Sequence, residues 1–270
     1  MRLAGKSAIV TGAGSRAAGI GNGRAAAILF AREGARVLLV DQSRSAAEET
    51  LRVIREEGGE GAVFEADVTR SDDCRAMVAD AVSRWGRLDI LQNNVGIGGR
   101  ATVVDVDPAD WDHMMRVNVT SMMLAAKHAI PAMVKGGGGA IVNISSISAL
   151  WQGRTTPGGF AGYDVAKAGV IRMATGLSRE LAPLGIRINC LAPGWIDSDG
   201  PRQYWESLTP EQRAARGVPS RLLKTTEVAD IVARIADDET LNGRVVVWWS
   251  EDRPRLVAWG DRGYRDFMNF

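Results

Sequence analysis

The sequence predicts an α/β fold, a doubly wound parallel sheet of about seven strands with helices on both faces. Short apolar runs rich in β-branched residues alternate with longer helical patterns along the chain. Continuously apolar runs are typical of strands buried on both faces, and long helices between them favour parallel crossovers. No linker or repeat divides the 270 residues, and the one low-complexity stretch is the glycine run at 136–139. We therefore expect a single domain over residues 1–270.

The first half of the chain begins this alternation. Strands are expected at residues 7–10, 36–41, 62–65 and 89–92, and helices at 23–32, 46–57 and 72–85. The alanine-rich helix over 23–32 is expected to end at Gly34, because glycine readily adopts the conformation that terminates a helix. These elements form successive β–α units of a parallel sheet.

The second half continues the pattern with longer helices. A helix over 108–134 begins with Pro108, which suits a first helical position, and ends before the glycine run. Further helices are expected at 162–181 and 228–236, and strands at 140–144, 186–191 and 244–249. The strand over 244–249 closes the expected sheet.

Composition excludes several classes of function. The net charge of +1 gives no basic field for nucleic acid or membrane headgroups. No apolar run is long enough to span a membrane, and the charged N-terminal segment does not read as a signal peptide. The distant Cys74 and Cys190 and the two histidines form no metal-ligand pattern. We expect a cytoplasmic protein with reduced thiols, no metal, and no nucleic-acid or membrane partner.

A glycine-rich segment, Thr-Gly-Ala-Gly-Ser-Arg-Ala-Ala-Gly-Ile-Gly-Asn-Gly-Arg over 11–24, joins the first strand to the first helix. Glycines there allow a tight turn and a close approach of the backbone to a pyrophosphate, and the following helix points its N-terminus at negative charge. A flexible surface loop is the alternative, but the strand–turn–helix context favours a phosphate site. The segment predicts a Rossmann-like dinucleotide-binding fold.

Asp41 ends the second expected strand, where such folds place a carboxylate that binds the adenosine ribose hydroxyls. Its charge would repel the 2′-phosphate of NADP, so NAD is favoured as the cofactor. Arg16 and Arg44 argue the other way, since either could accept that phosphate. Asp41 could also cap the next helix, and the two roles are compatible.

Tyr163 and Lys167 stand four residues apart in an expected helix, so they share one face. A free phenol titrates near pH 10, and lowering its pKa by about three units requires roughly 4 kcal/mol from neighbouring positive charge. Lys167 and a charged cofactor could supply it, which would make Tyr163 an acid/base group. An ordinary helical Tyr beside a solvated Lys is the alternative, and the surrounding motifs decide between them.

The surrounding motifs, taken in order over about residues 5–198, resemble those of the short-chain dehydrogenase/reductase family, of the Tyr-x-x-x-Lys type. Besides the glycine segment, Asp41 and the Tyr163/Lys167 pair, they are Asp67-Val68, Asn93-Asn94-Val95-Gly96, Asn118, Ser145-Ser146 and Pro193-Gly194. The family's Thr-Gly-x-x-x-Gly-x-Gly pattern would put glycine where Arg16 stands. If Gly21 and Gly23 close the pattern instead, the loop is longer than usual.

The resemblance implies an NAD(P)-dependent oxidoreductase that transfers a hydride between the cofactor and a secondary alcohol or ketone. Tyr163 is then the general acid or base, and Lys167 lowers its pKa and holds the nicotinamide ribose. Ser146 positions the substrate oxygen, and Asn118 supports a water chain to solvent. Ser145 is expected to be structural.

The resemblance also implies which residues bind the cofactor. Asp67 and Val68 would flank the adenine, and the segment from Pro193 would meet the nicotinamide. The full set is Gly12, Ser15, Ile20, Gly21, Gly23, Asp41, Asp67, Val68, Asn94, Gly96, Tyr163, Lys167, Pro193, Gly194, Ile196 and Ser198.

Three departures from the family concern the substrate. The interval from Ser146 to Tyr163 is longer than usual, and the extra residues at 151–160 are expected to line the entrance. The segment 199–221 is the family's variable substrate loop, and its aromatic residues, with Trp195, predict an apolar pocket for a cyclic or aromatic substrate. After the last strand, a polar tail over 251–270 replaces the usual turn, and we hypothesise that it covers the active site of a neighbouring subunit.

Several alternatives remain open on sequence alone. An NADP-dependent carbonyl reductase of the same family is one, and a non-catalytic dinucleotide-binding regulatory protein is another. An enoyl reductase would need a wider Tyr–Lys spacing than four. The resemblance suggests a homotetramer, or a dimer, built through the helices over 108–134 and 162–181.

Overall fold

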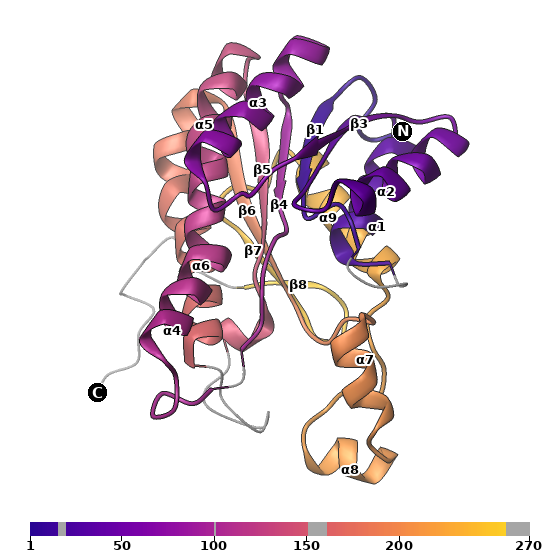
Figure 1. Cartoon of the computed structure of the whole chain (residues 1–270), viewed down its shortest axis with the longest axis vertical. Coiled ribbons are helices and arrows are strands. Elements are labelled where there is room, and N and C mark those ends of the chain that lie inside the picture. The colour runs from indigo at the N-terminus through magenta and orange to yellow at the C-terminus, as the bar shows by residue number, and fades with distance from the viewer. Residues whose placement is uncertain (16–19, 100, 151–160, 258–270) are drawn as a thin grey trace.

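An eight-stranded sheet forms the centre of the molecule in a computed structural model that describes residues 1–15, 20–99, 101–150 and 161–257 (Figure 1). The strand order is β3-β2-β1-β4-β5-β6-β7-β8, and all neighbours pair in parallel except β7 and β8. The strands are β1 (Ser7–Thr11), β2 (Arg36–Asp41), β3 (Glu60–Glu65), β4 (Ile90–Asn93), β5 (Gly139–Ile144), β6 (Ile186–Pro193), β7 (Val245–Trp248) and β8 (Arg255–Leu256).

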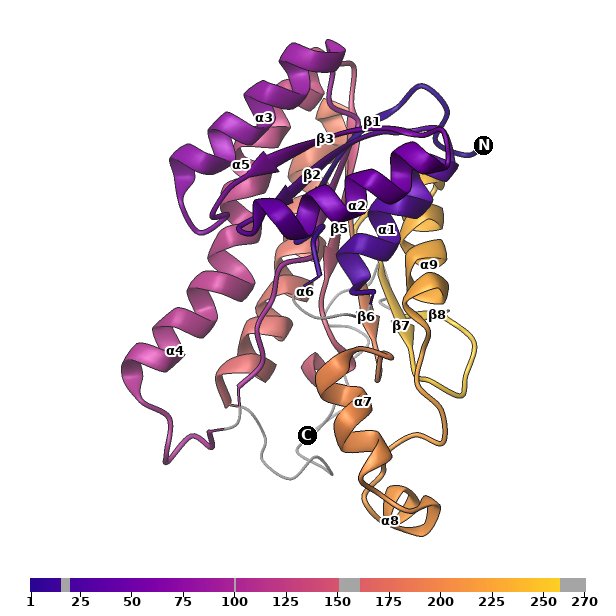
Figure 2. The same cartoon turned by 45° about the vertical axis from the view of Figure 1, so that its right-hand side comes forward.

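Helices cover both faces of this sheet (Figures 1 and 2). One layer contains α3 (Ser71–Trp85), α4 (Pro108–Met115), α5 (Ser121–Lys135) and α6 (Ala161–Leu181), and the other contains α1 (Asn22–Arg32), α2 (Arg44–Glu56) and α9 (Thr225–Asp237). The predicted single-domain α/β fold with a doubly wound, mostly parallel sheet is confirmed.

Side chains alternate between two apolar cores, one on each face of the sheet. On β1, Ile9 belongs to the core under α3 and α5, whereas Ala8 and Val10 belong to the core under α1 and α9. All three are fully buried. Because both faces are covered, the strands read as continuous apolar runs rather than as alternating ones.

One element differs from the sequence prediction on the face that carries α4 and α5. The single helix expected over 108–134 is divided by a π-helical turn, η1 (Arg116–Thr120). Asn118 lies in this turn and donates from Nδ2 to the carbonyl oxygen of Met114 at 3.0 Å. Such π-turns release backbone groups and often mark functional positions.

The segment predicted as a loop over 199–221 instead contains two helices, α7 (Asp199–Glu206) and α8 (Pro210–Ala215). They project beyond the carboxyl ends of the strands (Figure 2). A reciprocal capping box between Thr209 and Gln212 begins α8. We call these two helices the cap.

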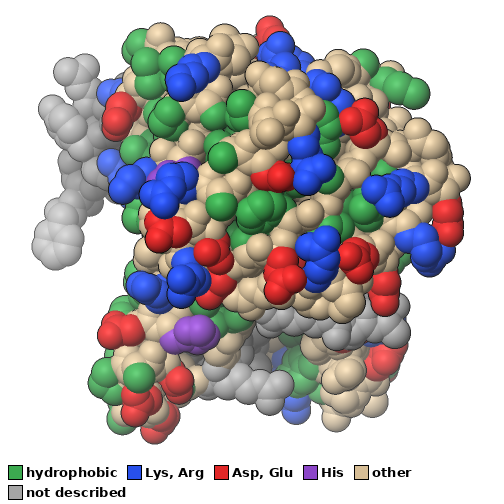
Figure 3. All heavy atoms as spheres, turned by 45° about the horizontal axis from the view of Figure 1, so that its top comes forward, with side chains coloured by type: hydrophobic (Ala, Val, Ile, Leu, Met, Phe, Trp, Pro, Cys, Tyr) green, Lys and Arg blue, Asp and Glu red, His purple; other side chains and the backbone are tan. Residues whose placement is uncertain are grey.

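Basic and acidic side chains are interspersed over the face shown in Figure 3. Among the described residues, no helix has the length and apolarity to cross a membrane. Within the same residues, His, Cys, Asp and Glu side chains form no group of three that could hold a metal.

Candidate active site

The carboxyl ends of β1 and β4 meet where the strand order reverses direction, the place where open parallel sheets bind ligands. Gly12 follows β1 with a φ of +66°, a conformation that favours glycine. A Cβ atom on Gly23 would lie 1.9 Å from the Gly12 carbonyl oxygen, so the loop and the first turn of α1 touch through backbone alone. Asn94, after β4, donates from Nδ2 to the same carbonyl at 3.4 Å.

The N-terminus of α1 fits a phosphate group. Gly21 is its N-cap residue and has no side chain with which to occupy the first backbone N–H groups. A helix N-terminus without a side-chain cap, with glycines at close approach, is the arrangement that binds a pyrophosphate.

Asp41 faces the glycine segment from the end of β2. Its Oδ2 accepts a hydrogen bond from the Gly14 N–H and its Oδ1 accepts one from the Ser43 N–H, each at 3.0 Å. The cap of α2 is made by the Ser43 side chain, which accepts from the Ala46 N–H. The carboxylate therefore lies beside the phosphate loop rather than serving as the side-chain cap of α2.

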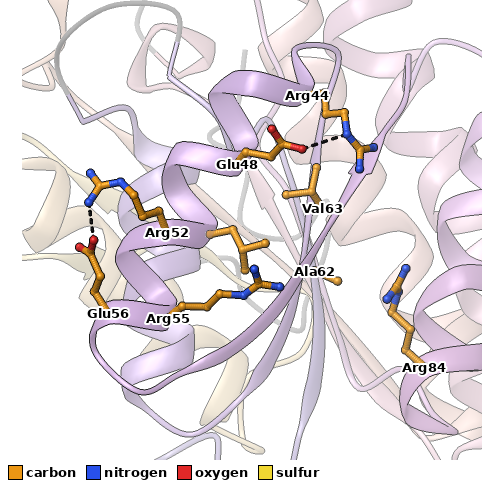
Figure 4. Close-up of a pocket in the computed structure, with 9 residues that line it drawn as sticks. Arg44, Glu48, Arg52, Arg55, Glu56, Ala62, Val63 and Arg84 are labelled. Carbon is orange, nitrogen blue, oxygen red and sulfur yellow. Dashed lines mark hydrogen bonds and ion pairs between the residues drawn. The ribbon is translucent and has the colours of Figure 1, made fainter.

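Arg44 points away from this carboxylate. Its guanidinium pairs with Glu48 at 3.0 Å and lines a groove over the outer side of α2 and β3 (Figure 4). The groove, of about 570 Å³, is lined by Arg44, Glu48, Leu51, Arg52, Arg55, Glu56, Ala62, Val63 and Arg84. None of the predicted catalytic residues lines it, so it is separate from the candidate active site.

Asp67 and Val68 follow β3, and their side chains lie in different surroundings. Burial alone would raise the pKa of Asp67, but hydrogen bonds from Thr69 and Gln42 and the charge of Arg70 lower it overall. The Val68 side chain is buried in the core under α3. The two residues therefore offer a carboxylate and backbone at the edge of the cleft.

Asn118 connects η1 to the segment after β4. Its side chain makes a reciprocal pair with the Ile97 backbone, donating from Nδ2 at 3.0 Å and accepting at Oδ1 from the N–H at 3.1 Å. A Cβ atom on Gly96 would lie 2.8 Å from Asn118 Oδ1 and 3.0 Å from Lys167 Nζ. Only a glycine leaves room for these two polar groups to converge.

Lys167 is buried, with only 4% of its surface exposed. Its ammonium donates to the Ile144 carbonyl oxygen at 3.0 Å. Burial lowers the pKa of Lys167 to about 8, against a smaller opposing effect of Cys190. The Ser145 hydroxyl donates to the Lys167 carbonyl at 2.7 Å, which agrees with the structural role expected for Ser145.

Tyr163 lies beside both Ser146 and Lys167. The Lys167 ammonium is 5.7 Å from the centre of the phenol ring, and the Ser146 hydroxyl hydrogen-bonds the phenol. Burial raises the pKa of Tyr163, Ser146 lowers it by less, and Asp164 raises it further. Among the protein's own groups desolvation outweighs these neighbours. The lowering predicted for Tyr163 included the charge of a bound cofactor and stays a prediction.

The segment after β6 carries the remaining predicted cofactor residues. Gly194 donates its N–H to the Trp248 carbonyl at 2.7 Å, and Ile196 forms a parallel bridge with Leu223. Ser198 is the N-cap residue of α7. Between them, Trp195 stacks on Tyr204 of the cap, with ring centroids 5.9 Å apart and planes at 26°.

The structure thus places the predicted site residues at one end of the sheet. Contacts join Gly12, Asn94 and Gly23, then Gly96, Asn118 and Lys167, and then Ser146 and Tyr163. Ile20 is exposed, at 48%, and Ser15 is half-buried. Arg16, the 151–160 insertion and the tail from 258 lie outside the described residues, so the roles predicted for them stay predictions.

Sequence analysis missed two features of this site. The cap was expected as a loop, although Thr-Pro-Glu-Gln at 209–212 is a capping-box signal. The turn at residues 249–254 between β7 and β8 was assigned to a polar tail. The sequence feature that could have indicated this turn is the departure from the family pattern after β7.

Comparison with known proteins supports the family assignment. A family model described as enoyl-(acyl carrier protein) reductase matches residues 15–247. A curated relative, 3-oxoacyl-[acyl-carrier-protein] reductase FabG of Thermotoga maritima, is 33% identical over 91% of this chain and 97% of its own length.

Solved structures agree. A protein of Burkholderia xenovorans described as a short-chain dehydrogenase/reductase is 37% identical, with a TM-score of 0.82 over 91% of this chain and 95% of its own. A 7α-hydroxysteroid dehydrogenase complexed with NADH and 7-oxo glycochenodeoxycholic acid is 29% identical, with a TM-score of 0.81 over 92% of this chain and 94% of its own. The chain therefore belongs to the short-chain dehydrogenase/reductase family of oxidoreductases.

Proposed function

We propose that this protein transfers a hydride between NAD(H) and a secondary alcohol or ketone, acting chiefly as a ketone reductase. The observation that carries the proposal is the convergence of Ser146, Tyr163, Lys167 and Asn118 at one end of the sheet. The Lys167 ammonium lies beside Asn118 Oδ1 in front of Gly96 and near the Tyr163 ring, and the Tyr163 phenol hydrogen-bonds the Ser146 hydroxyl. Such a set can hold a carbonyl oxygen and supply it with a proton.

In the proposed reduction the protein orients and protonates the substrate. When bound, the nicotinamide supplies the hydride. Ser146 donates a hydrogen bond to the carbonyl oxygen, and Tyr163 donates a proton to that oxygen as it becomes an alkoxide. Lys167 holds positive charge beside the resulting phenolate. Asn118 fixes the Ile97 segment, and so keeps the front of the site in place.

Tyr163 can supply the proton that this direction needs. A phenol with a raised pKa stays protonated at neutral pH, which suits a general acid. Alcohol oxidation needs the phenolate, and in this geometry the phenolate requires further positive charge nearby. Ketone reduction also agrees with the name of the Thermotoga maritima relative, a 3-oxoacyl-[acyl-carrier-protein] reductase.

Asp41, at the carboxyl end of β2, favours NAD over NADP as the cofactor. Asp41 lies against the Gly14 N–H, where a 2′-phosphate would meet its negative charge. Arg44, one of the two residues that argued for NADP, is paired with Glu48 on the outer side of α2. The NADH complex of the hydroxysteroid dehydrogenase relative agrees with this preference.

An apolar, ring-containing ketone is the proposed substrate. Trp195 and Tyr204 form a stacked aromatic wall where the cap meets the end of β6. Flat aromatic faces bury large apolar area with little loss of side-chain freedom. The relative bound to an oxo bile acid shows that this family includes enzymes for ring ketones.

Two other functions fit the site less well. The matched family model is named for an enoyl reductase, but four residues separate Tyr163 and Lys167 here, less than the spacing expected for that activity. A regulatory dinucleotide-binding protein would not need a complete acid/base set.

A spectrophotometric screen tests the proposal. The purified protein is assayed with ketones of increasing ring size and with NADH or NADPH, following absorbance of the reduced nicotinamide. We expect turnover with NADH that increases with apolar bulk. Tyr163→Phe should lose at least about a thousandfold in kcat while binding NADH normally, because only the proton donor is removed. Near-normal turnover in that variant, or a strong preference for NADPH, would overturn the corresponding part of the proposal.

A further inference from the structure

The turn at residues 249–254, which joins β7 to β8, lies against both segments that connect the cap to the sheet. The turn is ordered by its own contacts, since the Trp248 indole donates to the Asp252 carbonyl at 2.9 Å and the Asp252 N–H donates to the Trp249 carbonyl at 3.0 Å. β8 pairs with β7 through Val246–Leu256 and Val247–Arg255. The turn is therefore built onto the sheet, not onto the cap.

The outgoing segment of the cap contacts this turn at Gly194 and Trp195. A Cβ atom on Gly194 would meet Trp249 Cε3 at 3.1 Å and Ser250 Oγ at 3.3 Å. The fully buried Ser250 donates from Oγ to the Trp195 carbonyl at 3.4 Å. The turn thus contacts the backbone of Trp195, whose side chain stacks on Tyr204.

The returning segment contacts the turn at one peptide unit, the bond between Pro219 and Ser220. The Ser220 N–H donates to Glu251 Oε1 at 2.6 Å, and the Pro219 carbonyl accepts from the Trp205 indole of α7 at 2.8 Å. In a trans peptide these two groups point in opposite directions. One amide therefore joins the sheet-borne Glu251 on one side to the cap helix on the other.

The two hydrogen bonds of this amide support each other. A carboxylate that accepts from the N–H polarises the peptide and makes its carbonyl a better acceptor for the indole. Trp205 in turn stacks against Arg213 of α8, whose guanidinium carbon is 3.4 Å from the ring centre. The connection from Glu251 thus reaches both helices of the cap.

We infer that Glu251 is a positioning residue that holds the cap, and with it the Trp195–Tyr204 wall, at a fixed distance from the catalytic groups. Glu251 is exposed and contacts the returning segment through the side chain and the backbone N–H of Ser220 and through the nearby charge of Arg221, so it acts on substrate fit and not on proton transfer. A loose cap would weaken the binding of bulky ketones more than that of small ones, because we expect only bulky substrates to contact the Trp195–Tyr204 wall. The inference rests on the proposed function for its kinetic readout only.

Substitutions at Glu251 test the inference with a matched control. Glu251→Ala removes the acceptor, Glu251→Gln keeps an uncharged one, and Asp252→Asn removes the same charge one residue further along. We expect Glu251→Ala to raise KM about three- to tenfold for a bicyclic ketone, the scale of one lost ordinary hydrogen bond at an exposed position, with kcat for butanone unchanged. Glu251→Gln should lie between it and the wild type, and Asp252→Asn should match the wild type.

Hydrogen exchange gives a readout that needs no substrate. Amides of the cap over 203–217 should exchange faster in Glu251→Ala than in the wild type, with unchanged exchange in the central strands. Trp205→Phe should produce the same change, and the double variant no more than the larger single effect. Unchanged cap exchange, or an equal loss of protection throughout the sheet, would overturn the inference. If the wild type reduces no ketone, the proposed function fails while exchange still decides the role of Glu251.

Discussion

Lys167 is buried, and the loss of hydration there disfavours its charged form. It is 4% exposed, and burial brings the pKa of its side chain down to about 8 from the ordinary value of 10.5. Its hydrogen bond to the Ile144 carbonyl does not replace full hydration. A buried group that destabilises the fold at neutral pH is expected where function requires it.

Replacing Lys167 with Met should therefore raise stability while removing activity. Lowering the pKa of Lys167 from 10.5 to about 8 corresponds to about 3 kcal/mol of stability at neutral pH, less the lost hydrogen bond to Ile144. The unfolded chain binds more protons than the folded chain between about pH 8 and 10.5, so wild-type stability rises over that range. The advantage of Lys167→Met should be complete below pH 8 and vanish near pH 10.5. Thermal denaturation of cofactor-free protein at several pH values measures this, and a variant less stable than the wild type at pH 7 would contradict it.

The pH dependence of ketone reduction should also reflect Lys167. The ammonium is present below its pKa of about 8 and lost above it, while Tyr163, whose pKa is raised, keeps its proton over the same range. We expect kcat/KM for reduction to be level through neutral pH and to fall above about pH 8. A steady-state profile from pH 6 to 10 checks this. A level profile to pH 10 would show that the loss of this charge does not limit the reaction.

Residue identities at the site could be predicted from the sequence, but their electrostatics could not. Tyr163, Lys167, Ser146 and Asn118 belong to motifs whose order identifies them. The direction of the Tyr163 pKa depends on how much water the fold removes from the phenol. Spacing along a helix gives a neighbour but not the desolvation, which here outweighs it.

At the scale of elements, the packing of α1 against the glycine segment is the most demanding contact. The backbone oxygen of Gly12 lies where the Cβ atom of a larger residue at position 23 would be. Such a residue would push α1 away from the glycine segment and so displace the phosphate site. Flexible side chains could move to accommodate a methyl group, but the Gly12 carbonyl is fixed by β1, and moving it would destabilise the fold.

Gly23→Ala should consequently abolish or greatly weaken NADH binding and destabilise the fold. A matched control is Gly176→Ala on the exposed side of α6, where an added Cβ meets nothing within 4 Å. That variant should gain about 0.5–1 kcal/mol from helix propensity and bind NADH as the wild type does. Fluorescence titration with NADH and thermal denaturation give both quantities. Normal NADH affinity in Gly23→Ala would refute the close contact.

The sequence predicted most elements, and two of those it misjudged, the π-turn and the cap, have local causes. Periodicity over 108–134 is that of one helix, and the π-turn depends on a side-chain bond from Asn118 to a backbone carbonyl. The cap helices are short and polar, with few buried residues, so periodicity gave no signal. Only the capping box at 209–212 could have indicated α8.

At the scale of the whole molecule, we propose self-association through α5 and α6. Met123 and Val134 on α5 are each 42% exposed, and Val165 on α6 is 48% exposed. Large apolar side chains exposed on neighbouring helices are expected to be covered by another copy. The resemblance to the family suggests a homotetramer.

Met123→Glu combined with Val165→Glu should lower the molecular mass in solution, because each copy would bring like charges to the shared face. Val104→Glu, at a position that is 88% exposed and outside these helices, is the matched control. Analytical ultracentrifugation of the wild type should give a tetramer or dimer. A monomeric wild type would exclude the assembly, and an unchanged mass in the double variant would place the interface elsewhere.

Both edges of the sheet resist pairing with a foreign strand. At one edge, β3 begins and ends with the exposed carboxylates Glu60 and Glu65, beneath the arginines of the outer groove. At the other edge, β8 is two residues long and exposed, and one of the two is Arg255. Short, charged edges are poor templates for strand addition. The hairpin that supports the cap therefore also protects β7 from aggregation, and a chain shortened before β8 should precipitate more readily at high concentration.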